Sequence, residues 1–123
     1  MVLAVAIGGG IGAVARHWLA FQVTRLMGQG FPWGILCINI LGSVVMGILA
    51  ELFALRWSVT PEVRAFLTVG ILGGFTTFSS FSLDAALLIE RGQWLTAAAY
   101  VIGSVVLAIG GLFLGMAATR AVA

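Results

Sequence analysis

The chain contains no lysine, and only 8% of its 123 residues are charged. Its basic residues are six arginines, spread along the whole sequence, and its formal net charge is +2. Binding to DNA or RNA requires a clustered basic patch. Because the arginines are scattered, we expect no nucleic-acid partner.

Cysteine and histidine are nearly absent as well. Cys37 and His17 are the single residues of their types, so neither a disulfide framework nor a thiolate metal site can be built. Cys37 is expected to be a small, inert, buried side chain. Four scattered acidic residues form no catalytic constellation: Glu51, Glu62, Asp84 and Glu90. We therefore expect the protein not to be an enzyme.

What the chain has in abundance is apolar sequence, with 62% hydrophobic residues and a mean hydropathy of +1.19. Crossing a hydrocarbon core takes about 20 apolar residues in a helix. Segments near 2–23, 33–55, 63–89 and 95–118 each meet this length. We expect an all-α, multi-pass protein of the cell membrane, with residues 1–123 forming a single four-helix transmembrane domain in the lipid bilayer. Arg16 and His17 interrupt the first segment, so it is not expected to be a cleavable signal.

Short polar connections separate the four segments, and the second carries the clearest helix start. Thr60 is expected to cap the third helix, with Pro61 at its first position, where a missing N–H has no cost. From about 61 to 90 this helix would be on the order of 44 Å long, more than the roughly 30 Å of a hydrocarbon core. A break near its middle would relieve the excess.

The distribution of arginine favours neither orientation in the membrane. The side with both termini carries Arg56, Arg64 and Arg120. The other side carries Arg25 and Arg91, and also Arg16 if its side chain snorkels that way. Cytoplasmic loops normally carry an excess of basic residues. A balanced chain can insert both ways up, and two opposite copies can pair about an axis in the membrane plane. We predict an antiparallel, dual-topology homodimer.

The most informative stretch is polar and lies within the third apolar segment, where Gly73-Gly74-Phe75-Thr76-Thr77 leads into Phe78-Ser79-Ser80-Phe81-Ser82. Irregular backbone at membrane depth is tolerated only where protein or water covers it. If the helix unwinds here, the freed carbonyls suit a hard cation such as sodium. Alternatively, the hydroxyls bond back to their own helix and merely bend it. The residues alone favour the two readings about equally.

Several residues could serve an anion that passes through the membrane. Phe78 and Phe81 share a helical face, and aromatic ring edges are electropositive. Neutral donors suit an ion that must enter and leave quickly, and the candidates are Asn39, Ser79, Ser80, Tyr100 and Ser104. These groups can equally face lipid, cross-link helices or satisfy one another. The many glycines, Gly8, Gly12, Gly47 and Gly115 among them, are expected to allow close helix packing.

Arg16 lies roughly 10 Å inside the end of the first helix by helical rise. A guanidinium at this depth is costly, and it is usually paired or functional. It can line an aqueous vestibule that attracts anions, or it can snorkel to the headgroups.

The Gly73–Ser82 motif, Asn39 within Ile38-Asn39-Ile40-Leu41-Gly42-Ser43, and Gly12 to Arg16 closely resemble the Fluc (CrcB) family of fluoride channels. The resemblance covers all four spans. It implies a dual-topology homodimer with two antiparallel pores that passively export fluoride. It also implies pore-lining Phe78 and Phe81, a fluoride donor at Asn39, a vestibule arginine at Arg16, and a central structural sodium, not transported, on the carbonyls of Gly73 and Thr76.

The chain departs from this family pattern at four positions. Ile35 stands where Thr is common, and Asp84 where Glu is common. On the last helix Tyr100 and Ser104 begin a polar row, but Ala108 and Leu112 occupy its next two steps. We still expect conduction, at a rate that these departures can alter.

Two other classes compete with a fluoride channel. A small multidrug exporter is also a four-helix, dual-topology dimer, but it needs a membrane-embedded carboxylate that exchanges protons. The first helix here has no acidic residue, and Glu51 lies near the end of the second. A non-conducting scaffold would use the glycines and the broken helix for assembly alone. Transport that depends on a proton gradient would distinguish an exporter from a channel. Fluoride-selective flux would exclude a non-conducting scaffold.

Overall fold

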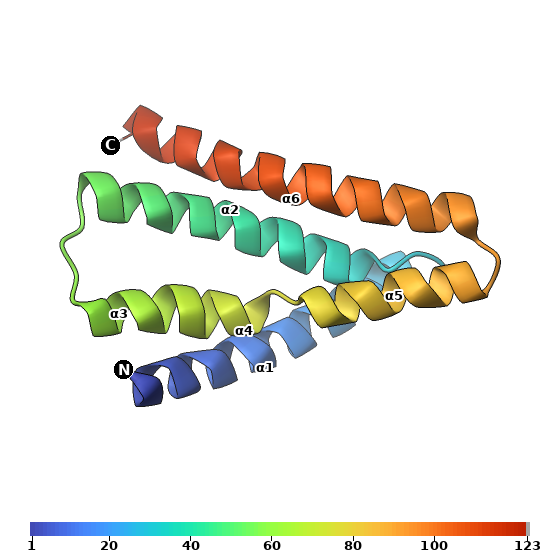
Figure 1. Ribbon diagram of the computed structural model, residues 1–123, viewed down its shortest axis with the longest axis horizontal. Helices are drawn as coiled ribbons and strands as arrows, with labels where there is room; N and C mark the ends of the chain where they lie inside the picture. The colour runs from blue at the N-terminus through green and yellow to red at the C-terminus, as the bar shows by residue number, and fades with distance from the viewer. Residues whose placement is uncertain (123) are drawn as a thin grey trace.

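The computed structural model describes residues 1–122, which form four membrane-length helical spans (Figure 1). The first two spans are single helices, and the third is divided into four pieces. The elements are α1 (Val2–Met27), α2 (Trp33–Leu55), α3 (Pro61–Ala65), the π-helix η1 (Phe66–Leu72), α4 (Gly73–Phe75), α5 (Phe78–Glu90) and α6 (Trp94–Val122).

The spans agree closely with the apolar segments of the sequence. The second has the predicted bounds, the first continues to Met27, and the fourth runs from Trp94 to Val122. The cap at Thr60 is confirmed, because its Oγ1 accepts a hydrogen bond from the N–H of Val63 at 3.3 Å and Pro61 begins α3. Helix capping thus defines where the third span starts.

Both termini lie at the same end of the molecule as the α2–α3 connection (Figure 1). At this end the guanidinium of Arg120, near the end of α6, donates to Oε1 of the buried Glu51 on α2 at 2.7 Å. A buried carboxylate is stable only when it is paired in this way. The pair fixes the end of α6 against the end of α2.

Glycines bring the helix backbones into contact, as predicted. A Cβ on Gly47 of α2 would overlap the carbonyl oxygen of Leu112 on α6, and one on Gly115 of α6 would overlap that of Val44. On the other side of the bundle, a Cβ on Gly12 of α1 would overlap the carbonyl oxygen of Ile71 in η1. Small residues allow helices to approach this closely where there is no water to drive association.

The third span is broken near its middle, where Thr76 (φ −82°, ψ 158°) and Thr77 (φ −152°, ψ 125°) have extended backbones between α4 and α5. The break thus falls on the last two residues of the Gly73–Thr77 stretch. Gly73 and Gly74 themselves are helical. Gly74 serves packing instead, since a Cβ there would overlap the carbonyl oxygen of Gly9 on α1.

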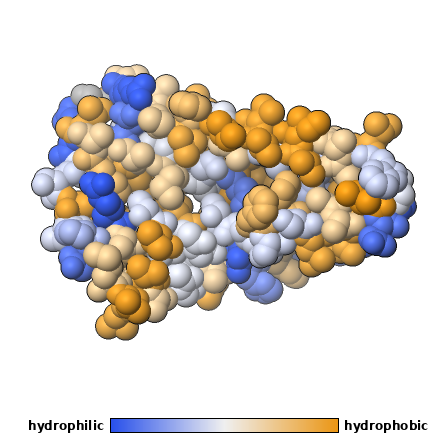
Figure 2. Space-filling model, viewed as in Figure 1, coloured by the Kyte–Doolittle hydropathy of each residue, from blue (hydrophilic) through white to orange (hydrophobic). Residues whose placement is uncertain are grey.

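The outer surface is largely apolar and the buried core is small. Hydrophilic residues gather toward the two ends of the long axis, and the surface between them is mostly apolar with a few hydrophilic side chains near its middle (Figure 2). The main buried cluster joins α2, α5 and α6 and contains Leu36, Phe81, Ala85, Leu88, Ala97 and Tyr100. An apolar exterior of this kind is the surface that a bilayer solvates.

Candidate functional site: a polar groove beside the broken helix

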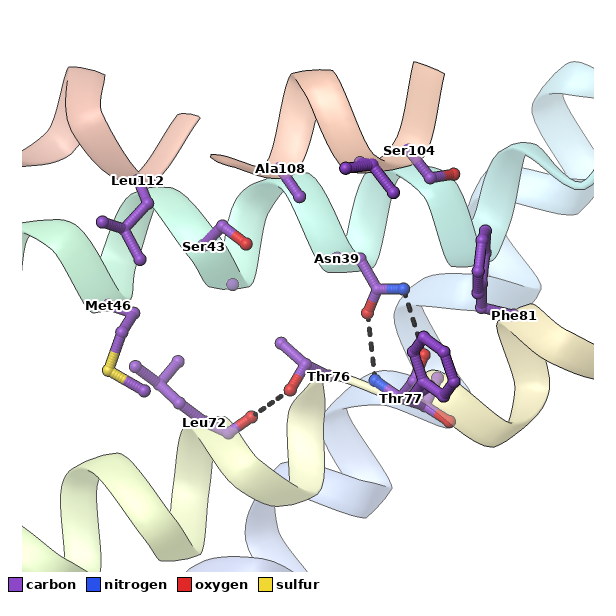
Figure 3. Close-up of a pocket in the computed structure, with 13 residues that line it drawn as sticks. Asn39, Ser43, Met46, Leu72, Thr76, Thr77, Phe81, Ser104, Ala108 and Leu112 are labelled. Atoms are coloured by element: carbon purple, nitrogen blue, oxygen red, sulfur yellow. Dashed lines mark hydrogen bonds between the residues drawn. The ribbon is translucent and has the colours of Figure 1, made fainter. Parts of the chain in front are cut away.

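Asn39, in the second turn of α2, bridges the break in the third span. Its side-chain Oδ1 accepts a hydrogen bond from the N–H of Thr77 at 3.0 Å, and its Nδ2 donates to the C=O of Thr77 at 3.1 Å (Figure 3). One amide therefore satisfies both backbone groups of an extended residue inside a membrane span. A primary amide has two N–H donors, so Asn39 keeps one for a further acceptor.

Thr77 also starts the second half of the span. Its Oγ1 accepts a hydrogen bond from the N–H of Ser80 at 3.2 Å, which makes Thr77 the N-cap of α5. Hydroxyl side chains are favoured at this position because they satisfy donors left free by the first turn. Thr77 is buried, so both its backbone and its side chain are committed to the break.

These bonds leave two carbonyls at the break without their ordinary helical donors. In an α-helix the carbonyl of residue i accepts from the N–H of residue i+4. The donor for Gly73 would be Thr77, which instead bonds to Asn39, and the donor for Thr76 would be Ser80, which bonds to Thr77. Among residues 1–122 no group of His, Cys, Asp or Glu could hold a metal. Backbone carbonyl oxygens are thus the ligands that the break offers to a hard cation.

The alternative reading of the hydroxyls also has support. The Oγ1 of Thr76 donates to the C=O of Leu72 at 2.9 Å, four residues earlier on its own helix. Such back-bonding bends helices and satisfies the hydroxyl locally. The side chain of Thr76 is thereby occupied, whereas the ordinary helical donor of its carbonyl, the N–H of Ser80, bonds to Thr77 instead.

A groove of about 320 Å³ lies beside the break, between α2, α6 and the third span. It is mainly apolar and contains a few polar groups (Figure 3). The residues that line it are Asn39, Gly42, Ser43, Met46, Leu72, Thr76, Thr77, Phe78, Phe81, Ser104, Val105, Ala108 and Leu112. An apolar hollow with a few neutral polar groups is suited to a small ion that must be held weakly.

Two aromatic rings, Phe78 and Phe81, line the groove, and a third, Tyr100, contacts Phe81. The centroids of Phe78 and Phe81 are 5.6 Å apart, and those of Phe81 and Tyr100 are 5.1 Å apart. Phe81 is 9% exposed, whereas Phe78 is 78% exposed. Phe81 is therefore part of this chain's own core, and Phe78 projects outward from it.

The hydroxyls of α6 differ in how they are used. Ser104 is buried in the groove, and its Oγ has no hydrogen-bond partner within the described residues. The hydroxyl of Tyr100 donates to Oδ2 of Asp84 at 3.2 Å. Ala108 and Leu112 continue the same wall beyond Ser104 (Figure 3). A buried polar group normally finds a partner, so Ser104 is a free donor at this wall of the groove.

The structure therefore gathers Asn39, Phe78, Phe81 and Ser104 around one hollow, with Tyr100 adjacent to it. Ser79 and Ser80 do not line the groove; Ser79 is exposed and lies 3.4 Å from Thr77, Oγ to Oγ1. Arg16 is half-buried on α1 and lies outside the groove lining.

Sequence reasoning missed the role of Thr77, which holds the break together. The available signal was a Thr immediately before a helix that restarts at Phe78, the pattern of an N-cap. It also missed Ser43 and Met46, which line the groove one and two turns along α2 from Asn39. Their spacing of three to four residues places them on the face of Asn39.

The fold and the groove define a multi-pass membrane protein in which a polar interruption of one span meets an amide from another. A family model described as CrcB-like protein, Camphor Resistance (CrcB), matches residues 3–116. The chain therefore belongs to the CrcB family.

Similar proteins with curated names cover almost the whole chain. It is 56% identical to the "Fluoride-specific ion channel FluC" of Rhodospirillum centenum, over 98% of this chain and 95% of the relative. It is 53% identical to the protein of that name from Nitrobacter winogradskyi, over 98% and 96%. Against the protein of that name from Agrobacterium fabrum, identity is 50% over 94% and 93%. These relatives are ion channels, so the chain is a protein of the cell membrane and not an enzyme.

Proposed function

We propose that the protein is a fluoride-selective ion channel that passively exports fluoride and so lowers its cytoplasmic level. The observation that carries this proposal is the groove at the break, which combines neutral donors, ring edges and apolar walls. The relatives named as fluoride-specific ion channels support it. Fluoride that enters a cell as the neutral acid and dissociates inside is the expected substrate.

The chemistry of the groove fits a small, strongly hydrated anion that must pass quickly. The remaining N–H of Asn39 and the hydroxyl of Ser104 are donors without charge. The edges of Phe78 and Phe81 add weak electropositive contacts. Such groups replace part of a hydration shell without the tight binding that a buried cation would impose.

We further propose that two chains assemble as an antiparallel homodimer with two pores. Phe78 is 78% exposed next to the groove, which places an aromatic ring where a second copy can use it. The even distribution of arginine supports insertion in both orientations. An axis in the membrane plane would then bring the two broken spans together.

A structural sodium ion is part of the same proposal, held by the carbonyls of Gly73 and Thr76 from both chains. These are the two carbonyls whose helical donors are used elsewhere, and oxygen ligands suit such an ion. When bound, sodium would supply positive charge to a ring of carbonyl dipoles. Replacing sodium by N-methylglucamine should lower the thermal midpoint of the purified protein, and restoring sodium should reverse the loss. An unchanged midpoint would count against the ion.

Fluoride efflux from liposomes, followed with a fluoride electrode beside a chloride-loaded control, tests the proposed function. Fast, proton-independent fluoride release with negligible chloride release supports it. Release that requires a proton gradient would favour the exporter, and no release from folded protein would favour the scaffold. The exporter is already disfavoured by Glu51, whose carboxylate is paired with Arg120 rather than free to exchange protons.

A further inference from the structure

A second hollow, the α2–η1 cleft, lies between α2 and the first half of the third span. Its volume is about 520 Å³. The residues that line it are Met46, Ala50, Phe53, Ala54, Arg64, Thr68 and Val69. Met46 lines both this cleft and the groove at the break, so its side chain is the boundary that the two hollows share. The α2–η1 cleft therefore lies next to the groove, on the side of Met46 that leads toward Arg64 and the start of the third span.

Arg64 is the one charged residue that lines this cleft, within the part of the chain described. Its guanidinium carbon lies 4.9 Å from the centroid of the Phe53 ring. No ion pair joins it to a carboxylate in residues 1–122, where Glu51 pairs with Arg120 instead. A cation over a ring face is held in place without an opposite charge. Arg64 is therefore oriented by Phe53 while its positive charge stays unneutralised.

We propose that the α2–η1 cleft is a water-filled vestibule that attracts anions, and that Arg64 is its charged group. This rests on the proposed function and adds to it the route by which fluoride reaches the groove at this end. Arg64 is exposed and lines the cleft. A positive charge beside the low-dielectric walls of a hollow raises the local concentration of small anions. Phe53 acts as a positioning residue, since it touches Arg64 and not the ion. The assignment is distinct from Arg16, which lies on α1 and lines neither hollow.

Thiol labelling tests the charge of the cleft without measuring flux. In a Cys37→Ala background, Thr68→Cys places a thiol in the cleft wall. We compare how fast this thiol reacts with an anionic reagent, sulfonatoethyl methanethiosulfonate, and with a cationic one, trimethylammonioethyl methanethiosulfonate. Each rate is divided by the rate of the same reagent with a free thiol in solution, which removes the difference in intrinsic reactivity. We expect the anionic reagent to be favoured by about five-fold at low salt. The preference should shrink in high salt, because exposed charges are screened.

Adding Arg64→Gln should remove the preference, and adding Phe53→Leu should reduce it. Arg25→Gln is the matched control, because it changes the net charge equally but lies at the end of α1, outside both hollows. Equal normalised rates for the two reagents would overturn the proposal. So would the absence of labelling, which would mean that lipid or a second copy of the chain fills the cleft. So would a preference that survives Arg64→Gln.

Flux measurements separate this proposal from the proposed function. In the same liposomes, Arg64→Gln should slow fluoride efflux two- to five-fold at low ionic strength and leave it unchanged at high ionic strength. If wild-type protein conducts and Arg64→Gln matches it at both salts, the vestibule is wrong and the channel stands. If wild-type protein conducts no fluoride, the proposed function fails, and the labelling ratios alone decide the charge of the cleft.

Discussion

Fluoride efflux should fall at least ten-fold when Asn39 is replaced by Leu, a side chain of similar volume without the amide. The change removes both hydrogen bonds to Thr77. Each is worth about 1 kcal/mol, and a backbone group left unsatisfied in the membrane costs about 1–3 kcal/mol more. Because the freed N–H of Thr77 can then return to the carbonyl of Gly73, the helix should partly close and the groove should lose its donor.

Efflux from liposomes containing purified Asn39→Leu protein measures this effect. Leu41→Ala is the matched control, since Leu41 is on the same helix, is 46% exposed and does not line the groove. We expect the control to conduct at the wild-type rate. Wild-type flux in Asn39→Leu would show that the amide bridge is not needed for conduction.

Stability, rather than flux, is the readout for the second large effect, Gly12→Ala. The new Cβ would overlap the carbonyl oxygen of Ile71 and come within 2.8 Å of the N–H nitrogen of Phe75. Both are backbone atoms, so α1 must move away from η1 and α4. Overpacking of this kind costs at least about 2 kcal/mol.

The temperature at which the monodisperse peak is lost in size-exclusion chromatography measures this cost. Gly10→Ala, two residues earlier on α1, is the control, because a Cβ there meets nothing within 4 Å. Replacing an exposed helical glycine by Ala should stabilise the helix by up to about 1 kcal/mol. Equal midpoints for the two variants would mean that the α1–η1 contact is looser than the structure has it.

The positions of the four spans could be predicted because they depend on local sequence alone. Apolar length defines each span, and Thr60 with Pro61 defines the start of the third. The residue at which the third span breaks could not be derived in the same way. Helix propensity points to Gly73 and Gly74, yet both are helical, and α1 packs closely against Gly74. Thr76 and Thr77 are extended because Asn39, on another helix, bonds to Thr77.

The candidate site shows the same division between local and long-range information. Face-sharing on one helix correctly grouped Phe78 with Phe81. Residues from different helices could be grouped only by their resemblance to a known family. Ser79 and Ser80 were included in that group, but they do not line the groove. The rotation of one helix against another decides which hydroxyls meet, and this rotation depends on glycine contacts that are far apart in sequence.

The extended conformation of Thr76 and Thr77 has a mechanical consequence. Both residues are β-branched, and among residues 1–122 no non-glycine residue has a positive φ. β-branched side chains are stiff at χ1 and prefer extended backbone. Three further hydrogen bonds anchor Thr77, to Asn39 and to Ser80. We therefore expect the two halves of the span to move as one rigid unit and not as a hinge, so that passage of an ion beside the break would require no bending of the helix.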